Sequence, residues 1–379
     1  MQLSRLGALS LLLVAMLTIM VGAALAPGLH TVAEGLGVSE YGPLLITLPA
    51  LGAIIFAPLF GRLIDRIGAR TTLLISLWGY FILGAGGAFL YGPWQVAIDR
   101  IILGGFAAGL MAAGTAVISQ WYQGAARLNM IAKQGMAIEL GGVVFLFIGG
   151  LLSGLSWQAP FLLYVMGLLC VILTVFFVPR RTESDTSEEN SDTVSSHTSS
   201  MGPIMLFTVL AMGLFFSFII SLPGFLANLD YSEAQTGYVL SFISLVAVFS
   251  AMSMPKVVAR CSVKYTLGIA FLTYAIGHLL FAFSSSNMTI ILASVFAGIG
   301  FGLSIPLLNH STVEMSNSSN LGRNLSLFAM AVFFGQFVTS ILEFIPLDHG
   351  KIFLVCAGLA VLCGIAVIYK KATAQQEAI

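Results

Sequence analysis

Long apolar runs separated by short polar stretches repeat along the whole chain. Each run has about the 20 residues that an α-helix needs to cross roughly 30 Å of hydrocarbon. The strands of a membrane barrel would be only about 10 residues long, so the pattern excludes a barrel. It predicts an all-α membrane protein with twelve transmembrane helices. We place them near 7–30, 42–61, 71–91, 94–121, 131–153, 159–178, 202–228, 236–255, 265–284, 288–309, 325–346 and 352–370.

The composition agrees with a chain that lies in a membrane. Of the 379 residues, 58% are hydrophobic and 8% are charged, whereas soluble domains have roughly 25% charged residues. The four cysteines and five histidines have no metal-ligand spacing, so we expect no metal and no cofactor. The sequence has neither the phosphate-binding glycine loop of an ATPase nor a basic face for nucleic acid, and we expect no enzyme.

The basic residues are concentrated in alternate loops. If the N-terminus lies inside, Lys351 falls in an outer loop and Arg100 in a helix, which leaves 14 of the 16 Lys and Arg residues in cytoplasmic segments. The positive-inside rule therefore predicts that both termini are cytoplasmic, with the chain in the inner (plasma) membrane.

The two halves of the chain carry related segments. Residues 61–70 have a basic residue at every fourth position, and residues 255–264, which follow 194 residues later, repeat this pattern. Other pairs at this offset are Gly104 and Gly298, Ala108 and Gly302, Met136 and Met330, Ala137 and Ala331, and Gly141 and Gly335. They predict two six-helix halves that are parallel repeats about an axis along the membrane normal.

A polar segment at 180–201 separates these halves. It is rich in Ser, Thr and acidic residues and has too little apolar surface to fold by itself. We predict an N-terminal half at 1–179, a disordered cytoplasmic linker at 180–201 and a C-terminal half at 202–379.

Several motifs resemble signatures of the major facilitator superfamily. The family pattern between helices 2 and 3, Gly-x-Leu-x-Asp-Arg-x-Gly-x-Arg, is matched by Gly61, Leu63, Asp65, Arg66, Gly68 and Arg70. Arg100 with the glycines after it resembles a second signature, in helix 4. The paired glycines Gly149 and Gly150 resemble the helix-5 signature of the drug-exporting branch, although the glycine–proline pair of that signature is absent. The resemblance covers essentially the whole chain and implies a monomeric transporter that works by alternating access.

The same resemblance implies that the 61–70 segment is a gate on the inner side. Its glycines would permit tight turns, and its arginines would face anionic lipid and helix C-termini. Asp65 would face the N-terminal end of the helix near 322–325, where a carboxylate gains about 0.3–1 kcal/mol from the helix dipole. In the second half Ala259 replaces this aspartate. The alternative is that these charges only fix the topology.

Asp99, Arg100 and Glu139 lie well inside the predicted helices, where a charge costs at least ~2.5–3.5 kcal/mol at mid-membrane. Asp99 and Arg100 lie near the outer end of helix 94–121, and adjacent side chains point about 100° apart, so we expect no simple neutralisation between them. Glu139 lies about 12 Å from the inner end of its helix, where burial favours a protonated carboxyl. These three residues are the candidates for proton coupling. The alternative is a static pair between Arg100 and a carboxylate that joins helices 94–121 and 131–153.

The resemblance places a substrate cavity between helices 1, 4, 7 and 10. Methionines and aromatic residues there would form a polarizable wall that suits varied amphipathic compounds. The candidates are Met16, Met20, Met111, Phe215, Phe216, Phe218 and Phe301; the alternative for each is packing or lipid contact.

These observations predict a proton antiporter that exports a small organic compound, such as a drug-like molecule or a siderophore. One alternative is proton-coupled uptake of an organic acid or a similar nutrient. A further alternative is a non-transporting membrane sensor, although neither the linker nor the C-terminal tail has room for an output domain.

Overall fold

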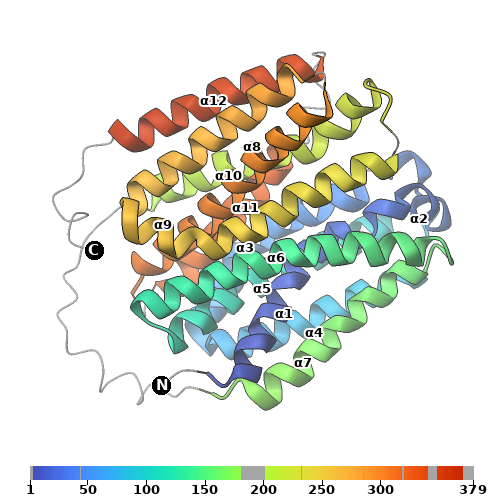
Figure 1. The fold of residues 1–379 in the computed structure, drawn as a ribbon. Coiled ribbons are helices and arrows are strands. Elements are labelled where there is room, and N and C mark those ends of the chain that lie inside the picture. The colour runs from blue at the N-terminus through green and yellow to red at the C-terminus, as the bar shows by residue number, and fades with distance from the viewer. Residues whose placement is uncertain are drawn as a thin grey trace.

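The computed structural model describes residues 3–42, 44–180, 201–231, 233–284, 286–317, 320–339 and 348–369, and the regular structure in them is helical (Figure 1). The α-helices are α1 (Arg5–Ala23), α2 (Leu29–Gly35), α3 (Leu44–Ile67), α4 (Ala69–Gly86), α5 (Pro93–Trp121), α6 (Gly124–Ser153), α7 (Met166–Phe177), α8 (Gly202–Ala227), α9 (Glu233–Ala282), α10 (Asn287–Glu314), α11 (Leu321–Thr339) and α12 (His349–Tyr369). Short 3₁₀ turns occur at Ala26–Gly28, Ser39–Tyr41, Gly87–Phe89 and Ala159–Val165.

Among the described residues, 11 helical segments are long and apolar enough to span a membrane. One of them, Tyr238–Ala282, has 45 residues, which is about twice the length of one crossing. It breaks at Ser262, where φ is 65° and ψ is 165°, and it therefore contains both helices predicted at 236–255 and 265–284. The described residues thus contain twelve crossings, as predicted. The start of α1 and the end of α12 lie at the same end of the bundle (Figure 1).

Two predicted loops are mostly helical. Helix α3 continues to Ile67, and α9 continues through Pro255 as far as the break at Ser262. In the first half the corresponding break is at Gly68, where φ is 86° and ψ is 153°. The two turns lie at the same offset as the sequence repeat and share one backbone conformation.

Some predicted helix ends were also wrong. The helix predicted at 7–30 ends at Ala23, because Pro27 in the following turn has no N–H to donate to a helical carbonyl. The helix predicted at 159–178 begins as the turn Ala159–Val165 before it becomes α7. Residues 340–347, in which the helix predicted at 325–346 would end, lie outside the described residues, as do residues 181–200 of the predicted linker.

A close helix contact is repeated in the two halves. A Cβ on Gly104 would collide with the carbonyl oxygen of Pro49, and a Cβ on Gly298 would lie 2.6 Å from that of Ile243. Both glycines and both carbonyls are related by the sequence offset, so each half packs its second helix against its fourth in the same way. This repeated contact supports the predicted internal duplication.

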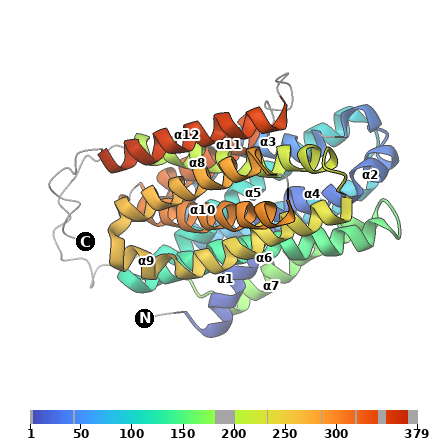
Figure 2. The same cartoon turned by 45° about the horizontal axis from the view of Figure 1, so that its top comes forward.

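The two halves, α1–α7 and α8–α12, meet along four helix pairs. Helix α3 packs against α11, α6 packs against α9 and α10, and α5 packs against α11. Figure 2, turned from Figure 1, shows α6 beside the part of α9 that precedes the break at Ser262. We call the end of the bundle at which α1 begins and α12 ends the terminal end. Helices α3, α5 and α10 end there and α6 and α11 begin there.

Candidate functional site

Asp65 joins the two halves at the terminal end. Its carboxylate oxygens accept hydrogen bonds from the backbone N–H groups of Gly322 at 2.8 Å and Arg323 at 3.1 Å. These N–H groups belong to the first turn of α11, where they have no acceptor within the helix. The predicted contact between Asp65 and the start of this helix is therefore present, and it caps a helix of the second half with a side chain of the first.

The glycines of the 61–70 segment have two different roles. Gly68 has a positive φ and forms the turn between α3 and α4, as predicted. Gly61 instead lies inside α3 and is buried, and a Cβ there would collide with the side chain of Ser326 on α11. The prediction of a turn at Gly61 was wrong, because this glycine brings α3 close to α11.

The arginines of the segment also differ. Arg66 is exposed in the last turn of α3. Arg70 donates from Nε to the carbonyl oxygen of Val178 at 2.5 Å and from Nη2 to that of Val175 at 3.1 Å. These are carbonyls at the C-terminal end of α7, so Arg70 contacts a helix C-terminus, as predicted.

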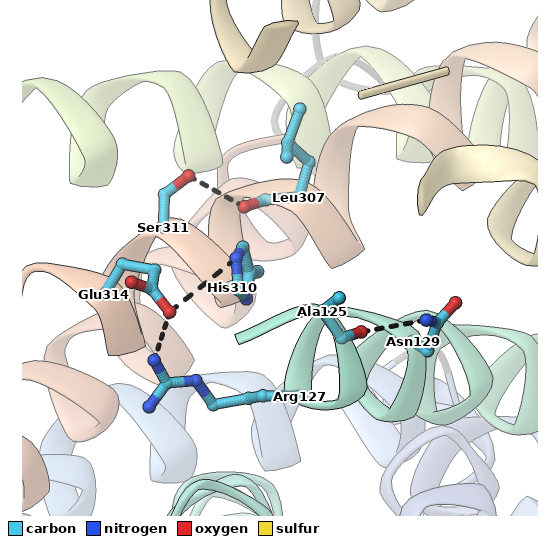
Figure 3. A network of polar contacts seen from close by, with 7 residues as sticks. All are labelled: Ala125, Arg127, Asn129, Leu307, His310, Ser311 and Glu314. Atoms are coloured by element: carbon cyan, nitrogen blue, oxygen red, sulfur yellow. Dashed lines mark hydrogen bonds and ion pairs between the residues drawn. The ribbon is translucent and has the colours of Figure 1, made fainter. Parts of the chain in front are cut away.

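A second connection between the halves was not predicted. The guanidinium of Arg127 on α6 forms an ion pair with the carboxylate of Glu314 on α10 (Figure 3). His310 Nε2 lies 3.8 Å from the same carboxylate oxygen, one turn earlier on α10. The remaining hydrogen bonds in Figure 3, from Ser311 and Asn129, stay within their own helices.

A third connection is a buried polar cluster made of Thr115 on α5, Gln134 on α6 and Asn309 on α10. Gln134 Nε2 donates to Thr115 Oγ1 at 3.0 Å. Asn309 Nδ2 lies 3.3 Å from both Thr115 Oγ1 and Gln134 Oε1, and donates to them across the boundary between the halves. We call these three residues the polar triad. Sequence reasoning missed it, although Thr115 and Asn309 are polar residues related by the repeat offset.

A small cavity of about 20 Å³ adjoins the polar triad. Met111 and Phe301, both predicted cavity residues, line it together with Gln134 and Asn309. The ring of Phe215 packs against that of Phe301 at a tilt of 44°, with ring centroids 4.1 Å apart. Phe215 therefore contacts a lining residue and does not itself line the cavity.

The other predicted cavity residues lie elsewhere. Met20 is fully buried, and the backbone of Met16 is packed against Gly141 on α6. The ring of Phe216 lies edge-on to the ring of Phe215, with ring centroids 6.0 Å apart. The ring of Phe218 stacks on His278, with centroids 3.8 Å apart. Because α8 and α9 both belong to the second half, Phe218 is in the core of that half and away from the cavity.

Asp99 and Arg100 form a buried ion pair. Arg100 donates from Nε and Nη2 to Asp99 Oδ2 at 2.9 and 2.6 Å. The prediction that they do not neutralise each other was wrong, because the long arginine side chain bends back to its neighbour although the two Cβ atoms diverge. The guanidinium carbon lies 5.6 Å from the ring centroid of Phe161 and 5.9 Å from that of Tyr164. The pair is therefore in the core of the first half.

Glu139 on α6 faces the second half without a charged partner. Its side chain is buried, with 1% of the residue exposed. The side chain of Ser244 on α9 faces it, but neither carboxylate oxygen has a hydrogen-bond partner of good geometry in the described part of the chain. Arg100 pairs with Asp99 instead, so the alternative of a static pair between α5 and α6 is not present.

Comparisons with known proteins agree with this architecture. The sequence model of the Major Facilitator Superfamily matches residues 11–260 and, in a second match, 204–378. The class D tetracycline resistance protein of Salmonella ordonez is 26% identical over 309 residues, which cover 75% of this chain and 74% of that protein. The multi-drug resistance efflux pump PmrA of Streptococcus pneumoniae is 25% identical over 305 residues and 76% of each chain.

The fold is also shared with solved structures. The proton:xylose symporter XylE superposes with a TM-score of 0.77 at 15% identity, over 95% of this chain and 94% of that one. At this identity the likeness concerns the fold alone. The family match covers nearly the whole chain, and the two halves repeat one helix contact. The chain belongs to the major facilitator superfamily.

Proposed function

We propose that the protein is a secondary transporter of the inner membrane that exports a small organic compound in exchange for protons. An efflux pump and tetracycline resistance proteins among its relatives support the direction of transport. The concentration of basic residues at the terminal end supports placing that end, with both termini, in the cytoplasm.

The connections at the terminal end support a gate there. Three contacts between described residues bridge the two halves there. They are the contact of Asp65 with the start of α11, the ion pair of Arg127 with Glu314, and the polar triad. In alternating access the halves rock about the binding site, and opening of the terminal end requires these contacts to separate. In the proposed orientation, this conformation is the one in which the cytoplasmic side is closed.

The observation that carries the proton-coupled mechanism is the buried Glu139 at the boundary between the halves, which has no charged partner among the described residues. An ionised carboxylate without a partner is costly in a buried site, so this conformation favours the neutral form of Glu139. When α6 and α9 move apart, water can reach the carboxyl and the proton can leave. Asp99 and Arg100 form the second candidate, but their pairing inside the first half supports a structural role.

The test is proton release from energised everted membrane vesicles, followed with a pH-quenched dye. A panel of cationic, neutral and carboxylate compounds, tetracycline included, is added in turn. We expect at least one compound to restore fluorescence with wild-type protein and not with Glu139→Gln. Glu40→Gln is the control, since it removes an exposed acid in the turn Ser39–Tyr41.

The other outcomes separate the alternatives. If Glu139→Gln behaves like wild type, Glu139 is not the proton carrier and Asp99→Asn is tested next. If no compound restores fluorescence, while right-side-out vesicles take up a compound together with protons, export is wrong and the protein is an uptake symporter. The symporter XylE has the same fold, so the fold does not set the direction. Absence of both activities would favour a sensor.

A further inference from the structure

The cavity beside the polar triad lies where equivalent residues of the two halves meet. Thr115 and Asn309 are separated by the repeat offset of 194 residues and contact each other directly. Met111 and Ile305, at the same offset, both line the cavity. Contacts between symmetry-equivalent residues occur on the axis that relates the repeats. The cavity is therefore on this axis, where transporters built from repeats bind their substrates.

The cavity has one unsatisfied polar group. Asn309 is 6% exposed, and its Oδ1 has no hydrogen-bond partner among the described residues. Its Nδ2 is shared between two acceptors at 3.3 Å, which is long for a hydrogen bond. Buried polar atoms are normally paired. An unpaired acceptor beside a cavity is a place for a ligand N–H or O–H group.

The rest of the lining is uncharged. None of the described residues around the cavity is ionisable, and apart from Gln134 and Asn309 the lining is apolar, with Met111, Phe301 and Phe328 among its side chains. Such a lining suits an aromatic or branched apolar body, whereas an ionic group would lose its hydration without compensation.

We propose that Gln134 and Asn309 form the polar end of the substrate site and recognise an uncharged amide or hydroxyl group on an otherwise apolar, aromatic compound. This inference rests on the proposed function and names its substrate class. A cavity of about 20 Å³ holds only about one water molecule, so the compound binds after the halves have moved apart. It then replaces the hydrogen bonds of the triad, which explains how one set of groups both closes the path and binds the substrate.

In this proposal the substrate and the proton bind at different sites. Gln134 and Glu139 are on the same helix, about 7.5 Å apart along its axis, but Glu139 faces Ser244 and does not line the cavity. An uncharged substrate does not compete with the proton for a carboxylate. The two are coupled because both sites are at the boundary between α6 and the second half, and both open when the halves separate.

The test compares two compounds in the everted-vesicle assay. Chloramphenicol is uncharged and has an amide and two hydroxyl groups, whereas the tetraphenylphosphonium cation has no hydrogen-bonding group. Loss of one hydrogen bond in Asn309→Leu or Gln134→Leu should raise the half-saturating concentration of chloramphenicol about 2- to 10-fold. That of tetraphenylphosphonium should change less than about twofold if it is transported, because it has no group to bind the amides.

The matched control is Thr312→Val on α10. Thr312 is fully buried like the triad, but its hydroxyl donates only to the Leu308 carbonyl of its own helix, at 2.9 Å. This control should leave both compounds unchanged. If a leucine variant does not reach the membrane, Asn309→Ser, which is smaller and replaces the amide by a hydroxyl, takes its place. Equal effects on the two compounds, or no effect on either, would overturn the proposal.

A binding measurement separates this proposal from the proposed export. Purified full-length protein should be stabilised against heat by chloramphenicol, and Asn309→Leu should lose this stabilisation. Proton release with other compounds but none with chloramphenicol, and no stabilisation by it, would overturn the substrate class and leave export standing. Stabilisation of the wild type without proton release from any compound would support the site and overturn export.

Discussion

Removing the Asp65 carboxylate should shift the protein toward the conformation that is open at the terminal end. In the present structure Asp65 accepts the N–H groups of Gly322 and Arg323, and both bonds cross from one half to the other. A change at Asp65 therefore acts on the balance between closed and open states. Asp65→Ala removes both acceptors and the charge, whereas Asp65→Asn keeps one acceptor oxygen.

The magnitude follows from the capping geometry. Loss of a side-chain cap costs about 0.5–2 kcal/mol, and the interaction of a charge with the helix dipole accounts for about 0.3–1 kcal/mol. Asp65→Ala should therefore raise the ratio of open to closed molecules about 2- to 30-fold. Asp65→Asn should raise it about 2- to 5-fold. Because Asp65 is exposed, salt should reduce the part of the effect that comes from its charge.

The assay is the distance between two spin labels at the terminal end, measured by electron–electron double resonance. The labels are placed on Gln123→Cys before α6 and Arg260→Cys on α9, two exposed positions in different halves. The background is a chain whose natural cysteines have been replaced. We expect the population at longer distance to increase in the order wild type, Asp65→Asn, Asp65→Ala.

Glu40→Gln serves as the control for loss of an exposed charge elsewhere. Its distance distribution should match that of the wild type. The reasoning would be refuted by a distribution that does not change in Asp65→Ala, or by a shift in Glu40→Gln of the same size.

The remaining predictions concern stability, measured as the melting temperature of the purified protein. Gly104→Ala should destabilise it by about 1–3 kcal/mol through overpacking, whereas Gly358→Ala, with no atom within 4 Å of the new Cβ, should be neutral or stabilising by up to about 1 kcal/mol. Ser262→Gly should stabilise by about 1 kcal/mol, since it relieves a backbone conformation that favours glycine; a lower melting temperature would contradict this. Asp99→Asn leaves a buried guanidinium unpaired and should cost about 3–5 kcal/mol, and adding Arg100→Gln should recover part of that loss.

The sequence was sufficient to predict the topology and those contacts that belong to a recognised motif. The apolar runs predicted twelve crossings because each run has the length of a membrane helix. The family pattern predicted the contact of Asp65 with the start of α11 and the turn at Gly68. These features depend on local sequence and on spacing, both of which can be read without a structure.

Other features depend on which face of a helix meets which neighbour. The helices are apolar on nearly all sides, so periodicity could not separate Phe301, which lines the cavity, from Phe218, which lies in the core of the second half. The pairing of Asp99 with Arg100 depends on the bend of a long side chain, which the directions of the Cβ atoms do not determine. The prediction for Gly61 failed because a glycine at a helix contact resembles a glycine at a turn in the sequence.

After the duplication, the two halves of this protein kept the same helix contacts, but the carboxyl groups proposed to function occur only in the first half. The glycine contacts are repeated, but Asp65 corresponds to Ala259, and Glu139 corresponds to Phe333. Each of these two carboxyls therefore lies against a group of the second half that is not its own counterpart: Asp65 against the start of α11, and Glu139 beside Ser244 of α9. Contacts of this kind cannot persist through a rocking motion, because the two partners belong to different moving bodies. In the proposed cycle, proton release from Glu139 and separation of Asp65 from α11 therefore both depend on the relative position of the halves. This dependence is the condition for coupling.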